Sequence, residues 1–456
     1  MAEPQDRWSG RVGFILATIA SAVGLGSIWK FPYEVGANGG GAFLFFYVLG
    51  LALVVAPLML AEMAIGRRGQ ADAALSMSTL AAGNGASRRW GIVGGLGVIT
   101  SSLILSYYSV IGGWAIAYAV EAAADGLATG GAAAAQARFD SLLGSTTRPL
   151  GYHTLFMSII ALIVARGIAG GIEVAVKLLM PVMVVLIVVL CIYSLIAGDA
   201  TAAVRFLFVP DFDRLSPRLA LEALGLGFFS IGVGYATLMT YTAYADRRID
   251  LRQAALVTLL GDTAVSLLSG LTVFSLVFAH KLDPGSGPGL VFVTLPLAFA
   301  EMRFGREAAV AFFACLGTAA LASAISMLEM PVAFLRRRFG WSRPAATALA
   351  GTACWLVGLA TVLSFGPWSG WRPLAAFGVL AGTGLFDLID GFASNVLLPT
   401  AGLGISLFAG WILPRHTLAE ELGLGARASH GLAFLMRYVV PAFIVLAALE
   451  PSLRPL

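Results

Sequence analysis

Long apolar stretches follow one another along the chain, separated by short clusters of charged residues, Pro and Gly. A helix needs about 20 mostly apolar residues to cross a bilayer, and many of these stretches reach that length. They predict eleven membrane-spanning helices, at about residues 11–36, 41–66, 91–124, 152–167, 171–197, 218–245, 252–280, 305–335, 343–364, 385–413 and 429–449. We therefore expect an all-α, polytopic membrane protein that forms one transmembrane domain over residues 1–456.

The composition agrees with this interpretation, because 59% of the residues are hydrophobic and only 12% are charged. Most of the 29 Lys and Arg residues would lie on the side of the N-terminus, which predicts a cytoplasmic N-terminus and, with eleven spans, a C-terminus on the opposite side. The net charge of +4 does not indicate nucleic-acid binding, since the arginines are spread over many loops. The three Cys and four His show no metal or redox spacing. We expect no cleavable signal peptide, because the first span is too long for its apolar core.

The first span has an unusual centre, the sequence VGLG at residues 23–26, and Pro32 follows it. Two glycines ease a departure from helical geometry, and proline withholds a backbone donor. A helix that is broken in mid-membrane exposes N–H and C=O groups that can bind a ligand, if the break faces protein or a wet cavity. The alternative is that the glycines only let a neighbouring helix pack closely.

A second glycine pair, Gly232 and Gly234, lies in the middle of the sixth span. The two glycine-interrupted spans are five spans apart, so the second would lie upside down relative to the first. Paired interruptions of this kind indicate an inverted-repeat transporter with its site at the repeat interface. We therefore predict a first repeat over residues 11–197, a second over 218–413 and an eleventh span at 429–449. Residues 284–302 are apolar but short and broken by Pro and Gly, which favours a re-entrant hairpin.

Several motifs resemble the neurotransmitter:sodium symporter family, and the bacterial amino-acid transporters in particular. The likeness covers almost the whole chain and includes Trp8 with GFILA at 13–17, AVGLG at 22–26, WKFP at 29–32, NGGGA at 38–42, PLMLAE at 57–62, Tyr107-Tyr108, FFS at 228–230, LVFVTLP at 290–296 and FDLID at 386–390. The resemblance implies the five-plus-five inverted-repeat fold of the bacterial leucine transporter, with helices 1 and 6 unwound in mid-membrane. Eleven helices are a known pattern among the bacterial members.

The resemblance also implies a substrate site at the two interruptions. The substrate-binding positions are Ala22, Gly24, Leu25, Gly26, Ile104, Tyr108, Phe229, Ser230, Gly232, Tyr235, Ser323, Ser326 and Met327. Monoamine-transporting relatives carry an Asp at position 24, so Gly24 implies a substrate that brings its own carboxylate. Gly232 stands where the leucine transporter has a serine, from which we expect extra room and a larger neutral side chain, apolar or aromatic.

Sodium sites follow from the resemblance as well. The first would use Ala22, Ser27, Ser230 and Asp262, and the second would use Ala20, Val23, Ala319 and Ser323. Relatives place a Thr where this chain has Ala322, so one sodium or two are both open. An acid within a span is a functional candidate, and the charge of Asp262 could replace the chloride that some relatives require.

Relatives close over the substrate with an outer Arg–Asp pair and an aromatic pair. The corresponding gate residues here are Lys30 with Asp390 and Tyr108 with Phe229. Lys30 lacks the bidentate fork of an arginine, so we expect a less fixed latch. At the inner side Arg336, Arg337 and Arg338 stand near where relatives place an Asp, so closure there must use other contacts, around Trp8 and Tyr244.

These features predict a sodium-coupled symporter of neutral, hydrophobic or aromatic amino acids that works by alternating access in a bacterial plasma membrane. The partners would be an amino acid, sodium and lipid, with no chloride requirement and no nucleic acid. The alternatives are a proton-coupled transporter that uses Asp262 and a sensor or channel on the same fold. An enzyme is not indicated, because the chain shows no nucleophile–base pair, metal motif or nucleotide loop.

Overall fold

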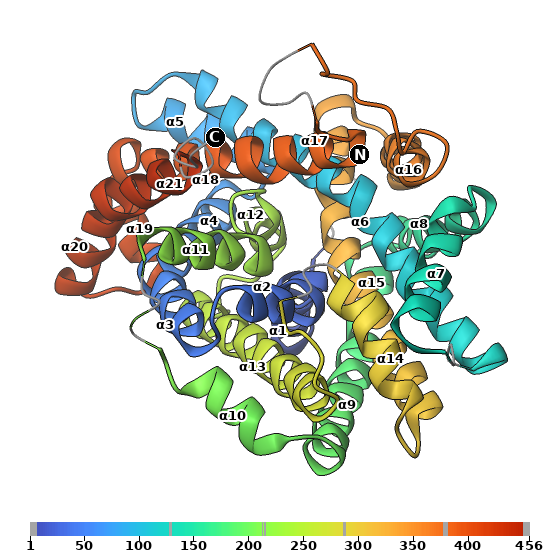
Figure 1. Cartoon of the computed structure of the whole chain (residues 1–456). Coiled ribbons are helices and arrows are strands. Elements are labelled where there is room, and N and C mark those ends of the chain that lie inside the picture. The colour runs from blue at the N-terminus through green and yellow to red at the C-terminus, as the bar shows by residue number, and fades with distance from the viewer. Residues whose placement is uncertain are drawn as a thin grey trace.

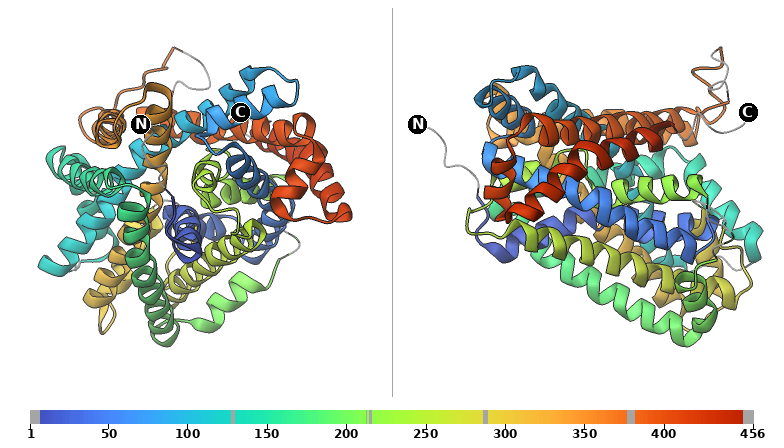
Figure 2. Two further views of the ribbon diagram at one scale, coloured as in Figure 1. Left: turned by 180° about the vertical axis from the view of Figure 1, so that it is seen from behind. Right: turned by 90° about the vertical axis from the view of Figure 1, so that its left-hand side faces the viewer.

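The computed structural model describes residues 7–126, 130–211, 213, 216–285, 289–376 and 382–449. These residues form helices that lie side by side along one common direction (Figure 2). Nine helices are long and apolar enough to cross a membrane among the described residues, and a bent pair makes a tenth. The nine are Gly41–Gly69, Arg88–Ala124, Thr147–Ala165, Ile168–Ala197, Leu251–Ala279, Gly305–Phe339, Arg343–Phe365, Leu385–Ile412 and Ala426–Ala448.

The bent pair is the first span, in which α1 (Arg11–Ala22) and the segment Gly26–Ala37 meet at 46°. The second half of this span begins with a π-helical turn (Gly26–Lys30) and continues as α2 (Phe31–Ala37). Pro32 is the second residue of α2, beyond the π-helical turn, and lies outside residues 23–25. The interruption therefore comes from residues 23–25, which we call the first break, and Pro32 does not cause it.

The sixth span is divided into α11 (Pro217–Ile231) and α12 (Thr237–Ala243). The intervening residues 232–236, the second break, include two glycines with positive φ, Gly232 and Gly234. Neither half is long enough to be counted as a span by itself. The prediction of eleven spans thus agrees with the described helices only if this divided segment is counted, and the boundaries of the two repeats stay a prediction.

The remaining spans contain further helices. The second comprises α3 (Gly41–Gly50) and α4 (Ala56–Gly69), and the third, fourth and fifth are α6 (Gly91–Asp125), α8 (Thr147–Ala165) and α9 (Glu173–Ala197). The seventh, eighth and ninth are α13 (Leu251–Ala279), α15 (Gly305–Phe339) and α16 (Arg343–Phe365). The tenth comprises α17 (Leu385–Gly391) and α18 (Leu398–Leu407), and the last comprises α20 (Ala426–Phe434) and α21 (Val440–Leu449).

Short helices connect the spans, namely α5 (Ala73–Gly83), α7 (Gly131–Gly144), α10 (Ala200–Phe208), α14 (Leu295–Ala300) and α19 (Arg415–Leu422). The apolar segment Leu290–Ala300 is too short to span a membrane, as expected for the hairpin at 284–302. The segment between the third and fourth spans contains the helix α7.

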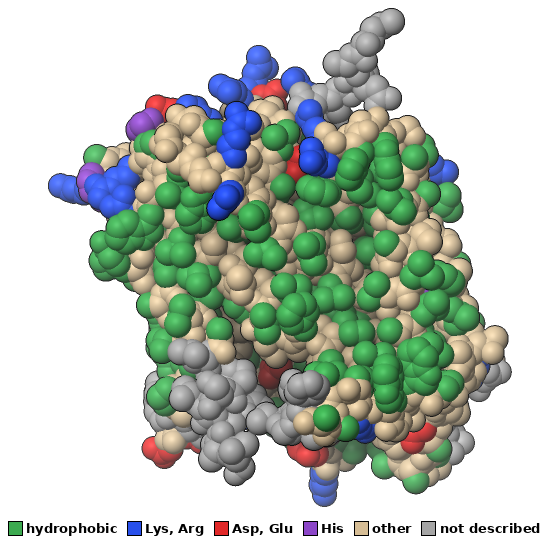
Figure 3. All heavy atoms as spheres, turned by 90° about the horizontal axis from the view of Figure 1, so that it is seen from above, with side chains coloured by type: hydrophobic (Ala, Val, Ile, Leu, Met, Phe, Trp, Pro, Cys, Tyr) green, Lys and Arg blue, Asp and Glu red, His purple; other side chains and the backbone are tan. Residues whose placement is uncertain are grey.

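Both broken helices lie at the centre of the bundle. Figure 1 shows α1, α2, α11 and α12 enclosed by the other helices, and α1 packs on α9, α13 and α15. Apolar side chains cover the middle of the outer face in Figure 3, whereas Lys and Arg gather at one edge. A lipid-facing surface therefore surrounds a core in which freed backbone groups are shielded from lipid. We call the end where α1 begins the Trp8 end and the opposite end the Lys30 end.

Candidate functional site

The helix ends that adjoin the two breaks touch one another in the core. A Cβ atom on Gly26 would lie 2.9 Å from the Cα of Ser230, so only glycine permits this approach. The backbone N–H of Leu25 donates to the Tyr108 hydroxyl over 2.9 Å. The space beside Gly24 is filled by the Tyr108 hydroxyl and by Ser323 of α15. The structure thus brings together residues from the first, third, sixth and eighth spans that the sequence assigned to one site.

A single buried carboxylate, that of Asp262 on α13, lies beside this contact with no exposed surface. The Ser27 hydroxyl donates to its Oδ1, and the Ser230 hydroxyl lies 3.1 Å from both carboxylate oxygens. The two serine hydroxyls are 3.3 Å apart. Three of the four residues predicted for the first sodium site therefore form one polar cluster.

Tyr47 of α3 completes the cluster and was missed by the sequence analysis. Its hydroxyl donates to Asp262 Oδ2 over 3.1 Å, and its side chain is fully buried. The residue stands in an apolar run, where one tyrosine is an ordinary core residue, so no local signal marked it. One turn further along α13, the buried Ser266 hydroxyl has no hydrogen-bond partner among the described residues.

The residues predicted for the apolar side of the site, Ile104, Tyr108, Tyr235, Ser326 and Met327, are buried, and Phe229 is partly exposed. The expected extra room at Gly232 is not there. A Cβ atom on Gly232 would lie 2.5 Å from the Tyr235 hydroxyl, so the tyrosine occupies the space that a side chain at 232 would need. The prediction of a roomier pocket was wrong, because it considered position 232 without its neighbour in the turn.

The predicted second sodium site lies where α1 ends. α1 stops at Ala22, and Val23 is extended, with ψ 113°, so the last carbonyls of α1 lack helical donors. The Ser323 hydroxyl donates to the Ser21 carbonyl over 3.3 Å. Ala319 and Ala322 are buried on the same helix as Ser323. The structure places a hydroxyl beside these carbonyls, although the residue it contacts is Ser21.

Glu62 of α4 supports the second break. Its Oε1 accepts a 2.6 Å hydrogen bond from the backbone N–H of Gly234, while its buried Oε2 finds no partner in the described part of the chain. The sequence analysis left Glu62 out of the site. The acid holds a backbone donor that the interrupted helix leaves without a helical acceptor.

At the Lys30 end, the expected gate residues are near one another but are paired differently. The Lys30 ammonium lies 4.4 Å from the centre of the Phe229 ring. Asp390 accepts a 2.9 Å hydrogen bond from Ser394, which lies 3.3 Å from the Tyr107 hydroxyl. Among the ion pairs found between described residues, none joins Lys30 to Asp390. The latch implied by the resemblance is therefore not formed in this conformation.

The Trp8 end is closed by contacts between the start of the first span and two other spans. The Trp8 indole donates to the Tyr241 carbonyl over 2.9 Å, and its backbone N–H lies 3.5 Å from the Tyr244 carbonyl. Both the N–H (2.8 Å) and the hydroxyl of Ser9 donate to the Glu173 carboxylate of α9. The sequence expected closure around Trp8 and Tyr244, and it missed Glu173.

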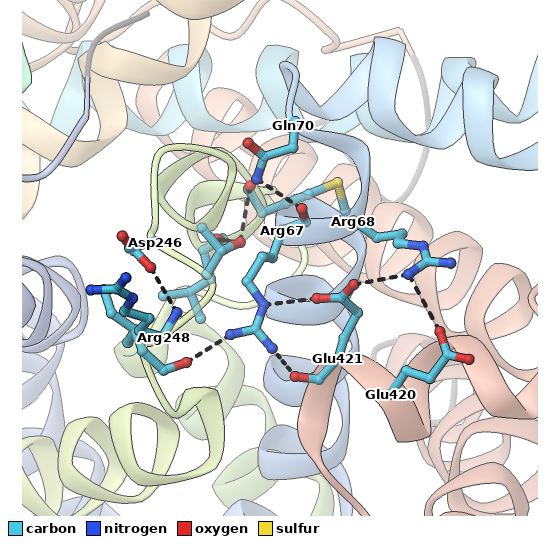
Figure 4. A network of polar contacts seen from close by, with 11 residues as sticks. Arg67, Arg68, Gln70, Asp246, Arg248, Glu420 and Glu421 are labelled. Carbon is cyan, nitrogen blue, oxygen red and sulfur yellow. Dashed lines mark hydrogen bonds and ion pairs between the residues drawn. The ribbon is translucent and has the colours of Figure 1, made fainter.

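Two buried ion pairs lie at the same end. Glu329 of α15 pairs with Arg343 of α16 and accepts a 3.1 Å hydrogen bond from the Tyr244 hydroxyl. Arg67 of α4 pairs with Glu421 of α19 over 2.8 Å and also donates to the Ile249 carbonyl (Figure 4). These contacts link the segment after α12 to spans that surround it.

Comparisons with known proteins agree with the geometry. The model of the sodium:neurotransmitter symporter family matches residues 5–134 and 142–377. The chain is 35% identical over 448 residues, 97% of each protein, to the uncharacterized sodium-dependent transporter YhdH of Bacillus subtilis. An uncharacterized sodium-dependent transporter of Haemophilus influenzae is 30% identical over 423 residues, 91% of each protein. The crystal structure of MhsT in complex with L-phenylalanine matches with a TM-score of 0.89 and 39% identity, covering 98% of this chain and 100% of that one.

Proposed function

Because this chain belongs to the sodium:neurotransmitter symporter family, and is thus a sodium-dependent membrane transporter and not an enzyme, we propose that it imports a neutral amino acid with an apolar or aromatic side chain. The observation that carries the proposal is the contact between Gly26 and Ser230, next to the two breaks and beside the buried carboxylate of Asp262. A carboxylate and backbone groups suit a cation, and the adjoining aromatic side chains suit an apolar substrate. Alternating access would expose this site to one side of the membrane at a time.

The substrate would supply its own carboxylate. The space at Gly24 is taken by Tyr108 and Ser323, so this region has no room for an acidic side chain at 24. The second half of the first span begins at Gly26, and its positive dipole end favours an anion. The Tyr108 hydroxyl accepts from Leu25 and can donate its own proton to the carboxylate. Carbonyls of Ala22, Phe229 and Ser230 would accept from the ammonium group.

An aromatic or branched apolar side chain would pack against Ile104, Tyr108 and Tyr235. MhsT, which shares 39% identity with this chain, holds L-phenylalanine in its crystal structure. Tyr235 occupies the space beside Gly232, so we expect it to limit the size of the substrate side chain and to offer a polar group at its far end.

The first sodium ion would lie among Ala22, Ser27, Ser230 and Asp262, where the substrate carboxylate would complete its ligands and couple the two solutes. A second ion would use Ala20, Val23, Ala319 and Ser323, with one hydroxyl fewer than in relatives because position 322 is alanine. Two ions and one ion remain the alternatives, and the steepness of uptake against sodium concentration separates them.

We propose that the fixed charge of Asp262 makes chloride unnecessary. Uptake by the native protein should then be unchanged when gluconate replaces chloride. Asp262→Asn removes the charge and should lose sodium-driven uptake in gluconate, with partial recovery in chloride, because an anion could enter beside Ser27 and the unpartnered Ser266 hydroxyl. Ser266→Ala is the matched control, since it removes one hydroxyl and keeps the charge. Chloride-stimulated uptake by the native protein would contradict this proposal.

The orientation is also a proposal. The Trp8 end would face the cytoplasm of a bacterium and the Lys30 end the outside, because Lys and Arg gather at cytoplasmic surfaces. In this structure the Trp8 end is closed, so sodium and substrate would enter from the Lys30 end.

Reconstituted proteoliposomes test the function directly. We would measure uptake of radiolabelled phenylalanine, leucine, tryptophan, glutamate and lysine with an inward sodium gradient and with potassium or choline in its place. Concentrative, sodium-dependent uptake of the apolar or aromatic members is expected. Uptake driven equally well by a proton gradient alone would favour a proton-coupled transporter, and binding without accumulation would favour a sensor or channel.

A further inference from the structure

The second break contains a residue in a strained backbone conformation. Gly232, Gly234 and Ala236 have φ values of 75°, 94° and 64°, all in the left-handed region. Glycine adopts such values as readily as negative ones. An alanine does not, because its Cβ atom approaches the following carbonyl oxygen, and the conformation is disfavoured by roughly tenfold relative to the helical one. Of these three left-handed residues, only Ala236 carries a Cβ atom, so only its backbone is strained at a positive φ.

The contacts around Ala236 explain how the strain is held. Its carbonyl accepts from the Thr240 N–H over 3.0 Å at the start of α12. Its methyl group faces Gly97 of α6, since a Cβ atom on Gly97 would lie 2.9 Å from the Cβ of Ala236. Two residues earlier, Gly234 is bound by Glu62. A strained residue persists only when its surroundings determine its conformation in this way.

The closure at the Trp8 end adds a further restraint. Trp8 binds the Tyr241 and Tyr244 carbonyls, at the far end of the helix that Ala236 precedes. When Trp8 leaves these carbonyls, α12 loses that restraint, and a change in backbone angles at the break can turn the helix. Movements of this kind are absorbed by a few residues at the ends of helices.

We propose that Ala236 is a strained hinge of the sixth span, which disfavours the closed Trp8 end and thereby eases its opening. It is a positioning residue that acts through α12 and does not itself bind a solute. The inference rests on the proposed alternating access, and it adds a named residue that sets the balance between two conformations.

Hydrogen exchange of the full-length protein in lipid nanodiscs tests the hinge. Amides that are protected only in the closed conformation exchange in proportion to the open population. In Ala236→Gly the strain is absent from the closed conformation, and glycine is also a poorer helix former than alanine in any relaxed one. Exchange of the α12 amides, residues 237–243, should therefore slow about five- to tenfold.

Lys281→Gly is the matched control. Lys281 is exposed, lies after α13, and has a positive φ of 55°, so this variant relieves similar strain away from the break. It should leave the exchange of α12 unchanged. Gly97→Ala pushes against Ala236 and the Tyr235 carbonyl carbon, the latter at 3.2 Å, and should speed the exchange of α12.

Unchanged or faster exchange in Ala236→Gly would overturn the hinge, since residue 236 would then keep its conformation throughout the cycle. Equal slowing in Lys281→Gly would overturn it as well, because it would reveal general stabilisation. In uptake, Ala236→Gly should lower kcat and the sodium concentration for half-maximal rate together. The exchange measurement needs no substrate, so a failure of amino-acid uptake in the native protein leaves the hinge separately testable.

Discussion

The acids that close the Trp8 end are almost fully buried, with 1% of the Glu173 side chain and none of the Glu329 side chain exposed. Each has a charged partner, and each accepts a hydrogen bond, Glu173 from Ser9 and Glu329 from Tyr244. At the Lys30 end, Lys30, Phe229 and Asp390 are all partly exposed, and the ammonium rests on an aromatic ring. Removing one partner of a buried ion pair costs about 3–5 kcal/mol, whereas an exposed cation–π contact contributes about 0.5–1 kcal/mol.

This difference in contact strength indicates which end of the bundle moves more easily from this conformation. Opening the Trp8 end would break the hydrogen bonds that Ser9 and Tyr244 donate to the buried carboxylates of Glu173 and Glu329, and a hydrogen bond to a charged group contributes about 1.5–3 kcal/mol. The Lys30 end is held by a weak contact, and no ion pair found between described residues joins Lys30 to Asp390. In the proposed alternating-access cycle, ligand binding between the breaks would draw these two residues together and strengthen the closure of this end.

Glu329→Gln should have the largest effect, because it leaves the Arg343 guanidinium buried without a counter-charge. We expect the free energy of unfolding to fall by about 3–5 kcal/mol, seen as a lower apparent Tm in detergent and as loss of uptake. Glu329→Gln with Arg343→Gln removes both charges and should recover most of the Tm. A double variant as unstable as the single one would show that uncompensated charge is not the cause.

Glu173→Ala should come next. It removes both hydrogen bonds from Ser9, and bonds to a charged group contribute about 1.5–3 kcal/mol. We expect faster hydrogen exchange in residues 9–22 with little change around Asp390. Lys177→Ala is the control, because this half-exposed lysine pairs with Glu173 over 2.6 Å but does not touch Ser9 in the contacts found. If both variants exchange alike, the ion pair and not the Ser9 contact holds this end.

The sequence predicted the parts of this picture that depend on composition and spacing. The length of the apolar stretches predicted the spans. The glycine pairs at 24 and 26 and at 232 and 234 predicted both breaks, because glycine eases a departure from helical geometry. Asp262 was recognisable because an acid within a span is costly. Each of these signals is local, so it can be read without knowing which helices are neighbours.

The parts that were missed depend on neighbours. Tyr47 is an ordinary core tyrosine until the fold brings its hydroxyl to Asp262 of α13, and Glu173 binds Ser9 only because α1 packs against α9. The room expected at Gly232 was absent because the turn itself brings Tyr235 back over the glycine. Tertiary packing decides these roles, and the sequence around each residue does not carry it.

Lys30→Arg tests whether a stronger contact at the Lys30 end changes transport. A guanidinium can stack on Phe229 and still present a fork to the Asp390 carboxylate, so the Lys30 end should stay closed longer. We expect kcat to fall and apparent substrate affinity to rise, each by about threefold to tenfold, which corresponds to about 1 kcal/mol. Adding Asp390→Asn should cancel most of both changes. A change that survives the second substitution would mean that the arginine acts through Phe229 alone.

The smallest effect is expected at Arg68, which shares Glu421 with Arg67 at the Trp8 end (Figure 4). Arg68 is 37% exposed and lies 3.3 Å from Glu421, whereas the Arg67 side chain is only 7% exposed and also binds the Ile249 carbonyl. Arg68→Gln should lower the free energy of unfolding by no more than about 0.5–1 kcal/mol.

Arg67→Gln should cost about 3 kcal/mol or more, because the buried Glu421 would keep only the partly exposed Arg68 as its ion-pair partner. The two variants remove the same charge from adjacent positions, so the difference in Tm reports the burial of Arg67 together with its backbone contacts. Equal losses would show that position, and not burial, governs the ion pairs of this end, and the contrast between the two ends would then need another physical basis.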